Sequence, residues 1–298
     1  MALSEERKAV LIEALRGHNV TTENITEEYM KNAELSEREE INLETESGTI
    51  KAYKFTAKNR IPNCPLHINV HGGGFVRPHA LRDELWSSKL ADAIQGIVID
   101  VDYPLAPEHP YPAAFNLTYE LVKYIFASAG EMDVDSKRIS MGGHSAGGNL
   151  TAAVALKANK TGDFKLCLQV MDYAVLDMAT DQASKPAAEG NLIPSERGRM
   201  FNEAYTDGDL SKTKEIYCSP LLASDEDLAG LPDALIISAG KDMFRFEDTE
   251  YARRMALAGV RVTTKCYTES NHGFTIHCTG DWEEAQDLII SEVKRAAL

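Results

Sequence analysis

Apolar runs of strand length alternate with segments of helix length from about residue 42 to the end of the chain. The runs at 96–102 and 234–239 are almost continuously apolar, as expected for strands covered on both faces. This alternation predicts an α/β protein with a mostly parallel sheet wrapped by helices. We expect about eight strands, at 41–46, 50–56, 65–70, 96–102, 137–142, 165–171, 233–239 and 261–267. We expect the intervening helices at about 80–95, 112–129, 147–160, 245–259 and 281–297.

Two stretches of the chain depart from the alternation. Residues 1–40 have the pattern of two amphipathic helices that precede any strand. Residues from about 177 to 225 form an insertion between two strands that is too long for a simple loop, with helical composition around 195–205. We interpret 1–40 as N-terminal cap helices, and 41–298 as a catalytic domain that carries the insertion as the rest of the cap. The alternative is that the N-terminal helices only pack on the edge of the sheet.

The composition excludes several classes of partner. The chain has 298 residues and a formal net charge of −15, with no basic cluster, so it would repel nucleic acids and anionic membrane surfaces. The first residues lack the pattern of a signal peptide, and no apolar run is long enough to span a membrane, so we expect a cytoplasmic protein without stable membrane insertion. A homodimer is compatible with this sequence, which does not specify an oligomeric state.

The cysteines give no sign of a metal site or a disulfide framework. There are five of them, scattered and without a Cys-x-x-Cys pair. We therefore expect reduced and mostly buried thiols, and no bound metal.

A candidate nucleophile lies between an expected strand and an alanine-rich helix. The pentapeptide 143–147 reads Gly-His-Ser-Ala-Gly, and in this context Gly-x-Ser-x-Gly predicts a sharp turn that exposes the Ser145 hydroxyl. Gly143 and Gly147 would let the flanking segments approach closely. The amide of Ala146, at the N-terminus of the helix, could donate to an oxyanion.

A glycine-rich loop follows the expected strand at 65–70. Residues 71–75 read His-Gly-Gly-Gly-Phe, and successive glycine amides can point at one small anion. We interpret Gly73 and Gly74 as the remaining oxyanion donors. A merely flexible glycine loop would be the alternative if this motif stood alone, but the nucleophile turn supplies its missing counterpart.

The motifs at 71–75, 102–114 and 143–149 together resemble the hormone-sensitive-lipase-like family of α/β-hydrolase esterases. The resemblance covers about residues 65–280. It implies the α/β-hydrolase fold, a helical cap built from the N-terminus and an insertion, and hydrolysis of carboxylic esters, usually with short acyl chains, without a metal or cofactor. The family usually has Asp-Pro-Leu where this chain has Asp-Met-Phe at 242–244, and it often has an acid where this chain has His144.

The general base is sought among eight histidines. In this fold the base follows both the nucleophile and the acid, which leaves His272 and His277. We favour His272 as the base, because it lies in a short loop after the strand 261–267, at the expected active edge of the sheet. Its Asn-His-Gly-Phe context also matches the family pattern. His144, beside the serine, cannot easily turn its ring back across the turn.

Asp242 is the candidate acid, because it directly follows the strand 233–239 and could orient the imidazole of His272. Glu247 and Asp248 are rivals, but they fall in the following helix, where exposed charges are expected.

The sequence thus predicts a serine carboxylesterase that acts on small esters through an acyl-enzyme intermediate. The alternatives are an amidase or peptidase with the same chemistry, and a small-molecule receptor that has kept the fold without the activity. A lipase acting at lipid surfaces fits less well, since no interfacial segment is evident.

Overall fold

A single eight-stranded sheet organises the chain in the computed structural model, which describes residues 2–16, 24–186 and 193–298. The strand order is β1-β2-β4-β3-β5-β6-β7-β8; the first two strands run antiparallel at one edge and the other six are parallel. The strands are β1 Ser36–Thr45, β2 Gly48–Ala57, β3 Cys64–Val70, β4 Ile97–Asp102, β5 Val134–His144, β6 Leu168–Asp172, β7 Asp233–Ala239 and β8 Val262–Tyr267. The expected mostly parallel sheet is confirmed, although β1 begins at Ser36, five residues before the expected position.

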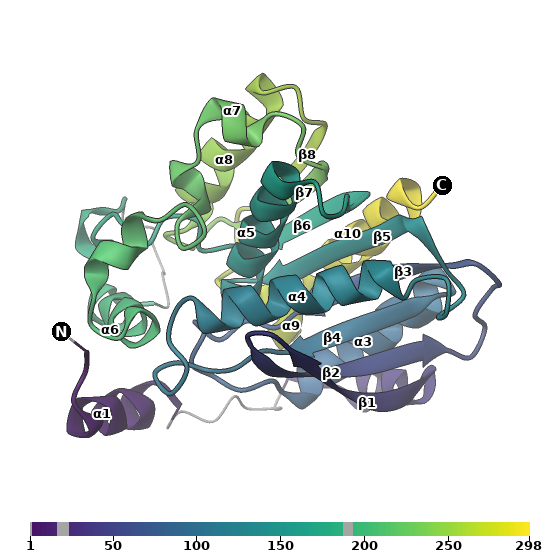
Figure 1. Ribbon diagram of the computed structural model, residues 1–298, viewed down its shortest axis with the longest axis horizontal. Helices are drawn as coiled ribbons and strands as arrows, with labels where there is room; N and C mark the ends of the chain where they lie inside the picture. The colour runs from purple at the N-terminus through teal and green to yellow at the C-terminus, as the bar shows by residue number, and fades with distance from the viewer. Residues whose placement is uncertain (1, 17–23, 187–192) are drawn as a thin grey trace.

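Helices cover both faces of this sheet (Figure 1). One face carries α4 (Ala113–Ala127), α5 (Ala146–Thr161) and α8 (Arg245–Leu257). The other carries α3 (Leu81–Ile94) and α10 (Trp282–Ala296). These five helices lie where the sequence predicts them, each within two residues at either end.

Burial on both faces explains the apolar runs in the inner strands. In β4, Ile97 and Ile99 belong to the core beneath α4 and α5, whereas Val98 belongs to the core beneath α3 and α10. In β7, Ile236 and Ile237 divide between the two cores in the same way. Since neither face meets water, alternation with polar residues disappears from these strands.

The two helices of the N-terminal segment pack against different parts of the molecule. Helix α1 (Glu5–Arg16) lies beside α6 (Ser195–Thr206) from the insertion, as Figure 1 shows, and Arg7 forms an ion pair with Glu203 at 2.6 Å. The short helix α2 (Glu27–Met30) lies on the sheet-covering helices instead, where Tyr29 accepts a hydrogen bond from Gln286 of α10 at 2.9 Å. The two helices therefore do not form one unit.

The insertion at 177–225 consists of short helical pieces around α6. They are the 3₁₀ turns η2 Gln182–Ser184, η3 Leu210–Lys214 and η4 Pro220–Leu222, followed by α7 Asp225–Leu228. Pro220 begins η4, where its missing N–H group costs no helical hydrogen bond.

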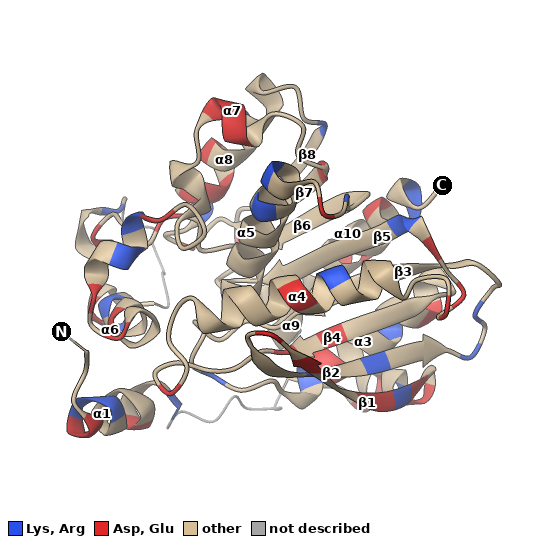
Figure 2. Ribbon diagram, viewed as in Figure 1, with Lys and Arg blue, Asp and Glu red and all other residues tan. Residues whose placement is uncertain are grey.

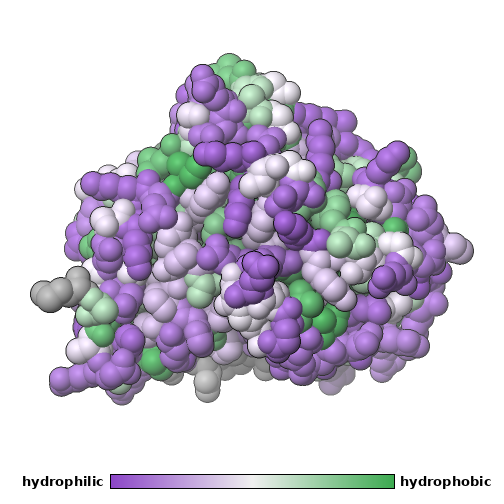
Figure 3. Space-filling model, viewed as in Figure 1, coloured by the Kyte–Doolittle hydropathy of each residue, from purple (hydrophilic) through white to green (hydrophobic). Residues whose placement is uncertain are grey.

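Figure 2 shows charged residues of both signs distributed over the helices, with acidic and basic residues on the edge strand β1. The face seen in Figure 3 is largely hydrophilic, with only scattered apolar spots. In the described ranges, no helix is both long and apolar enough to cross a membrane. All five cysteines are free; Cys64 and Cys218 are buried and Cys266 is exposed.

The turn between β5 and α5 is closely packed against β3. A Cβ atom added to Gly147 would lie 1.9 Å from the carbonyl oxygen of Val70, and one on Gly143 would lie 2.6 Å from the same atom. These contacts involve backbone, which cannot rotate away as a side chain can. The two glycines are therefore required by the close approach of three segments.

We predict that Gly147→Ala lowers the free energy of unfolding by about 3 kcal/mol, because the methyl group must displace the end of β3. Chemical denaturation measures this loss. Gly130→Ala is the matched control, since a Cβ there meets no heavy atom within 4 Å. Equal stability of the two variants would contradict the packing described for the turn.

Candidate active site

Ser145 occupies the turn at the carboxyl end of β5, immediately before α5. Its φ of 54° and ψ of −113° are unusual for a residue with a side chain. The Ser145 amide donates to the carbonyl of Asp172 at 2.9 Å, which ties the turn to the end of β6. This conformation presents the hydroxyl at the edge of the sheet where the parallel strands end.

The structure brings Ser145, His272 and Asp242 together in one hydrogen-bonded line. Nε2 of His272 lies 2.9 Å from Oγ of Ser145, and Nδ1 of His272 lies 2.5 Å from Oδ2 of Asp242. Asp242 is fully buried after β7, and its Oδ1 accepts a hydrogen bond from the amide of Phe244 at 3.2 Å. His277, the rival histidine, ends the short helix α9 (Phe274–His277) and lines the same cavity. The arrangement suits proton transfer from the hydroxyl to the imidazole.

Two aromatic rings hold the imidazole of His272 from different sides. The ring centroids of Tyr173 and Phe244 lie 5.0 Å and 5.4 Å from that of His272, both nearly edge-on. Phe244 is one of the two residues, with Met243, at which this chain departs from the Asp-Pro-Leu pattern. The departure therefore places a large ring against the imidazole.

The glycine loop lies directly against the nucleophile turn. A Cβ on Gly72 would be 3.6 Å from Cβ of Ser145, so the two backbones are in contact. Gly73 and Gly74 adopt φ values of 106° and 62°, which favour glycine. Within the described part of the chain, neither of their amides donates a hydrogen bond, and the amide of Ala146 has no acceptor within its helix because it is the first residue of α5. These three amides are available to an anion.

Tyr103 holds the start of the glycine loop in place through its hydroxyl group and its ring. Its hydroxyl lies 3.1 Å from the carbonyl oxygen of His71 and 3.2 Å from that of Gly72, and donates to them. Its ring stacks on the imidazole of His71 at a centroid distance of 4.1 Å. Burial lowers the pKa of His71 to about 3, so this imidazole is neutral and structural.

Asp172 is a residue of the site that the sequence did not reveal. Besides accepting from the Ser145 amide, it binds Nδ1 of His144 through its carboxylate at 2.8 Å. His144 thus turns away from the serine toward the end of β6, as its position in the turn requires. A signal for Asp172 existed, because it is a polar residue directly after a buried strand at the active edge of the sheet.

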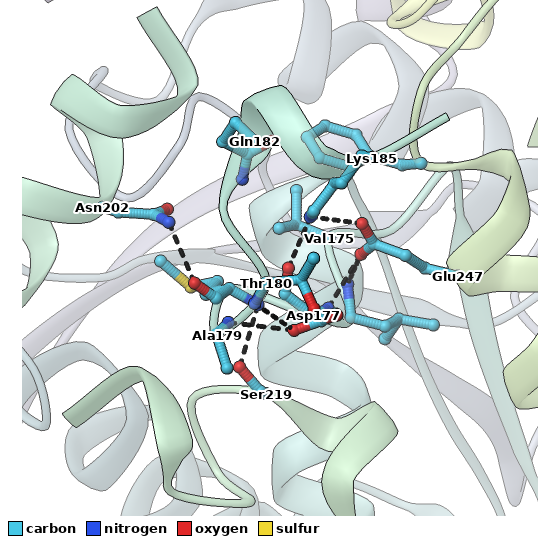
Figure 4. Close-up of polar contacts among 12 residues, drawn as sticks. Val175, Asp177, Ala179, Thr180, Gln182, Lys185, Asn202, Ser219 and Glu247 are labelled. Atoms are coloured by element: carbon cyan, nitrogen blue, oxygen red, sulfur yellow. Dashed lines mark hydrogen bonds and ion pairs between the residues drawn. The ribbon is translucent and has the colours of Figure 1, made fainter. Parts of the chain in front are cut away.

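Glu247 and Asp248 are buried, so the expectation of exposed charges in this helix is wrong. Glu247 accepts hydrogen bonds from the amides of Leu176 and Asp177, both at 2.8 Å, and forms an ion pair with Lys185. Figure 4 shows Lys185 and Glu247 pointing toward one another where the insertion leaves the sheet. The first turn of helix α8 therefore anchors the insertion 177–225 instead of facing water.

A cavity of about 270 Å³ opens above Ser145. The insertion contributes Met178, Gln182 and Phe201 to its walls, and the glycine loop forms part of its floor. The Phe201 ring lies so close to Gly74 that an added Cβ would be 2.4 Å from it. In the ranges that the structure describes, no group of three or more His, Cys, Asp or Glu side chains is arranged to hold a metal ion.

Residues 67–276 match the model of a family described as the alpha/beta hydrolase fold, and the chain belongs to this family. The chain is 31% identical to carboxylesterase NlhH of Mycobacterium tuberculosis over 218 residues, which cover 71% of this chain and 67% of the relative. It is 27% identical to arylacetamide deacetylase of Oryctolagus cuniculus, over 68% of this chain and 67% of that one. The crystal structure of a thermostable esterase from Pseudomonas putida superposes with a TM-score of 0.81 at 28% identity, over 100% of this chain and 98% of the other. Within the fold family, this protein is a carboxylic ester hydrolase of the hormone-sensitive-lipase-like group.

We predict that Lys185→Gln lowers the free energy of unfolding by about 3 kcal/mol, because it leaves the carboxylate of Glu247 buried without its cationic partner. Burial raises the pKa of Glu247 to about 7 against the opposing effect of Lys185, so unfolding should be measured at pH 8, where the carboxylate is ionised and depends on that partner.

The matched control for this variant is Lys31→Gln, which removes an exposed ion pair with Glu28 and should change the free energy of unfolding far less. Equal effects of the two substitutions would refute the anchoring role of Glu247.

Proposed function

We propose that the protein hydrolyses short-chain carboxylic esters through an acyl-enzyme intermediate, with Ser145 as nucleophile, His272 as general base and Asp242 as the residue that orients the base. The observation that carries this proposal is the continuous hydrogen-bonded line from the Ser145 hydroxyl through His272 to buried Asp242. A serine hydroxyl is a poor nucleophile near pH 7, and this geometry supplies the base that activates it.

The reaction takes place in two similar halves. His272 takes the proton of Ser145 as the oxygen attacks the ester carbonyl, and then returns that proton to the departing alcohol. Water attacks the resulting acyl-enzyme with His272 again as base, and the acid leaves as Ser145 recovers its proton. Asp242 holds the imidazole in the tautomer that accepts at Nε2 and stabilises the imidazolium that forms.

Three backbone amides would stabilise the negative charge that develops on the carbonyl oxygen. They belong to Gly73, Gly74 and Ala146, which flank Ser145 and have no competing acceptor among the described residues. Each such donor is worth about 3 kcal/mol to the transition state. Because Tyr103 holds the carbonyls at the start of the loop, these amides are in place before substrate arrives.

A cap formed by α1 and the insertion 177–225 would shape the substrate pocket. Its contacts with the body include the ion pair of Lys185 with Glu247, and those with α1 include the ion pair of Arg7 with Glu203. The 270 Å³ cavity beneath it lies just below the range of about 300–1,000 Å³ for drug-sized ligands, which favours a small ester.

Amide hydrolysis is the second candidate, because a relative named for arylacetamide deacetylation is among the similar proteins. The same nucleophile and oxyanion donors serve both reactions. Comparing p-nitrophenyl acetate with p-nitroacetanilide separates them, and faster turnover of the anilide would reverse the order of the two candidates.

Ser145→Ala is expected to reduce kcat toward p-nitrophenyl butyrate by roughly a millionfold while the protein remains folded. Release of p-nitrophenol measures the rate, and circular dichroism checks the fold. Ser136→Ala, which changes an exposed serine at the opposite end of β5, should keep full activity. Substantial turnover by the Ser145 variant would rule out the assigned nucleophile.

The cavity volume predicts a limit on the acyl chain. Across p-nitrophenyl esters from acetyl to decanoyl, kcat/KM should fall beyond about eight carbons, because longer chains exceed the enclosed space. A steady rise up to the decanoyl ester would contradict the proposed role of the cap in shaping the pocket.

A further inference from the structure

Three arginines line the cavity above Ser145. Arg77 follows the glycine loop, Arg82 lies in the first turn of α3, and Arg197 lies in α6 of the insertion. They reach the same space from three segments that are distant in the sequence. The proposed ester hydrolysis uses none of them.

These arginines differ from most others in the chain because they have no acidic partner among the residues that the structure describes. Eight arginines form ion pairs with carboxylates, namely Arg7, Arg16, Arg38, Arg60, Arg199, Arg253, Arg254 and Arg295. In the described part of the chain no ion pair involves Arg77, Arg82 or Arg197. In a protein with 46 acidic and 31 basic residues, unpaired arginines that converge on one cavity need an explanation.

Two of these arginines have buried nitrogen atoms that lack a hydrogen-bond partner among the described residues. Arg82 is only 4% exposed, and its Nε has no hydrogen-bond partner among the described residues. One terminal nitrogen of Arg197, Nη2, is also buried without a partner there. Nε of Arg77 donates to the carbonyl of Leu15 at 2.8 Å, which is not an anion. Buried donors of this kind are costly unless a bound group satisfies them.

The other titratable groups that face the cavity neutralise at most one of the three positive charges. Asp83 is the one carboxylate among the described lining residues; its Oδ2 accepts from the amide of Ala80 at 3.1 Å, and burial raises its pKa to about 6. Burial, with Arg82 and His272 nearby, lowers the pKa of His277 to about 4, so that imidazole is neutral at pH 7. Arginine remains protonated even where burial lowers its pKa. The cavity therefore carries net positive charge.

We propose that this cavity selects esters that carry a second, carboxylate group, and that Arg82 and Arg197 bind this carboxylate while Ser145 attacks the ester. This inference rests on the proposed esterase function and adds the substrate class. A guanidinium presents a planar fork of donors that matches the two oxygens of a carboxylate, and such charge-assisted hydrogen bonds are strong in a desolvated site. The carboxylate can belong to the acyl or to the alcohol part of the ester, and the experiment below distinguishes these two sources.

Two pairs of substrates test the preference. For the acyl side, the monoester p-nitrophenyl hydrogen adipate is compared with p-nitrophenyl adipamate, in which a neutral carboxamide replaces the carboxylate. For the alcohol side, 4-acetoxybenzoate is compared with 4-acetoxybenzamide. In at least one pair, we expect kcat/KM for the anion to exceed that for the amide by about tenfold or more, mainly through a lower KM. A ratio of one or less in both pairs overturns the inference.

Arg82→Gln and Arg197→Gln should reduce this ratio about tenfold, while kcat/KM for the neutral ester changes less than about threefold. Arg199→Gln is the matched control: it lies two residues further along α6, is exposed, pairs with Asp181, and should leave the ratio unchanged. Because Arg82 is buried, its variant could fail to fold; the partly exposed Arg197 then decides the question. An unchanged ratio in the folded variants overturns the inference.

The parent activity is tested separately with p-nitrophenyl acetate. Turnover of this neutral ester without any preference for the anions leaves the esterase function standing and removes only the carboxylate site. Loss of turnover for every ester, including the acetate, contradicts the esterase function itself.

Discussion

The close approach of the start of α5 to the end of β3 is the constraint on which the site depends. The carbonyl of Val70 lies where any side chain at Gly147 would be, so the chain must leave β5 through a turn too sharp for ordinary residues. Ser145 adopts a φ of 54°, a conformation that costs about 1–3 kcal/mol and persists only where the surrounding structure holds it. The carbonyl of Asp172 does so through the Ser145 amide. Asn149, one turn into α5, adds hydrogen bonds to the carbonyls of Val175 and Cys218.

The residues around this turn also connect the proposed catalytic site to the insertion 177–225. The ring of Phe75, directly after the glycine loop, stacks on Tyr205 of α6 at a centroid distance of 3.7 Å. The segment that leaves β6 passes Asp172 and Tyr173 at the site and then reaches the anchor formed by Glu247 and Lys185. A displacement of the insertion 177–225 would therefore move groups that touch both the glycine loop and the imidazole of His272. This coupling is mechanical, since it runs through packed rings and buried hydrogen bonds.

The sequence predicted the structure correctly where the physical cause acts within a single segment of the chain. The apolar runs located the strands because burial on two faces acts on every residue of a strand, and each residue proposed for proton transfer follows one of these strands. Prediction failed where the environment of a side chain is decided by a distant partner. Glu247 has the sequence context of an exposed helical acid, and only the arrival of Lys185, sixty-two residues earlier in the chain, makes its burial stable. The separation of α2 from α1 likewise depends on the contact of Tyr29 with Trp282, which local periodicity does not reveal.

The arginines of the cavity would attract an anionic substrate, whereas the net charge of the whole protein would repel it. At physiological ionic strength the Debye length is about 8 Å, so most of the surface carboxylates are screened from an approaching ion. Inside the cavity the screening is far weaker, and the guanidinium of Arg82, which is almost wholly removed from water, acts at close range. The net charge of −15 therefore bears on encounter rates and solubility, while recognition is decided by the few charges that water does not reach. A positively charged cavity can therefore select anionic esters in a protein whose net charge is negative. Its selectivity would follow from ion pairs formed inside the cavity and not from long-range attraction.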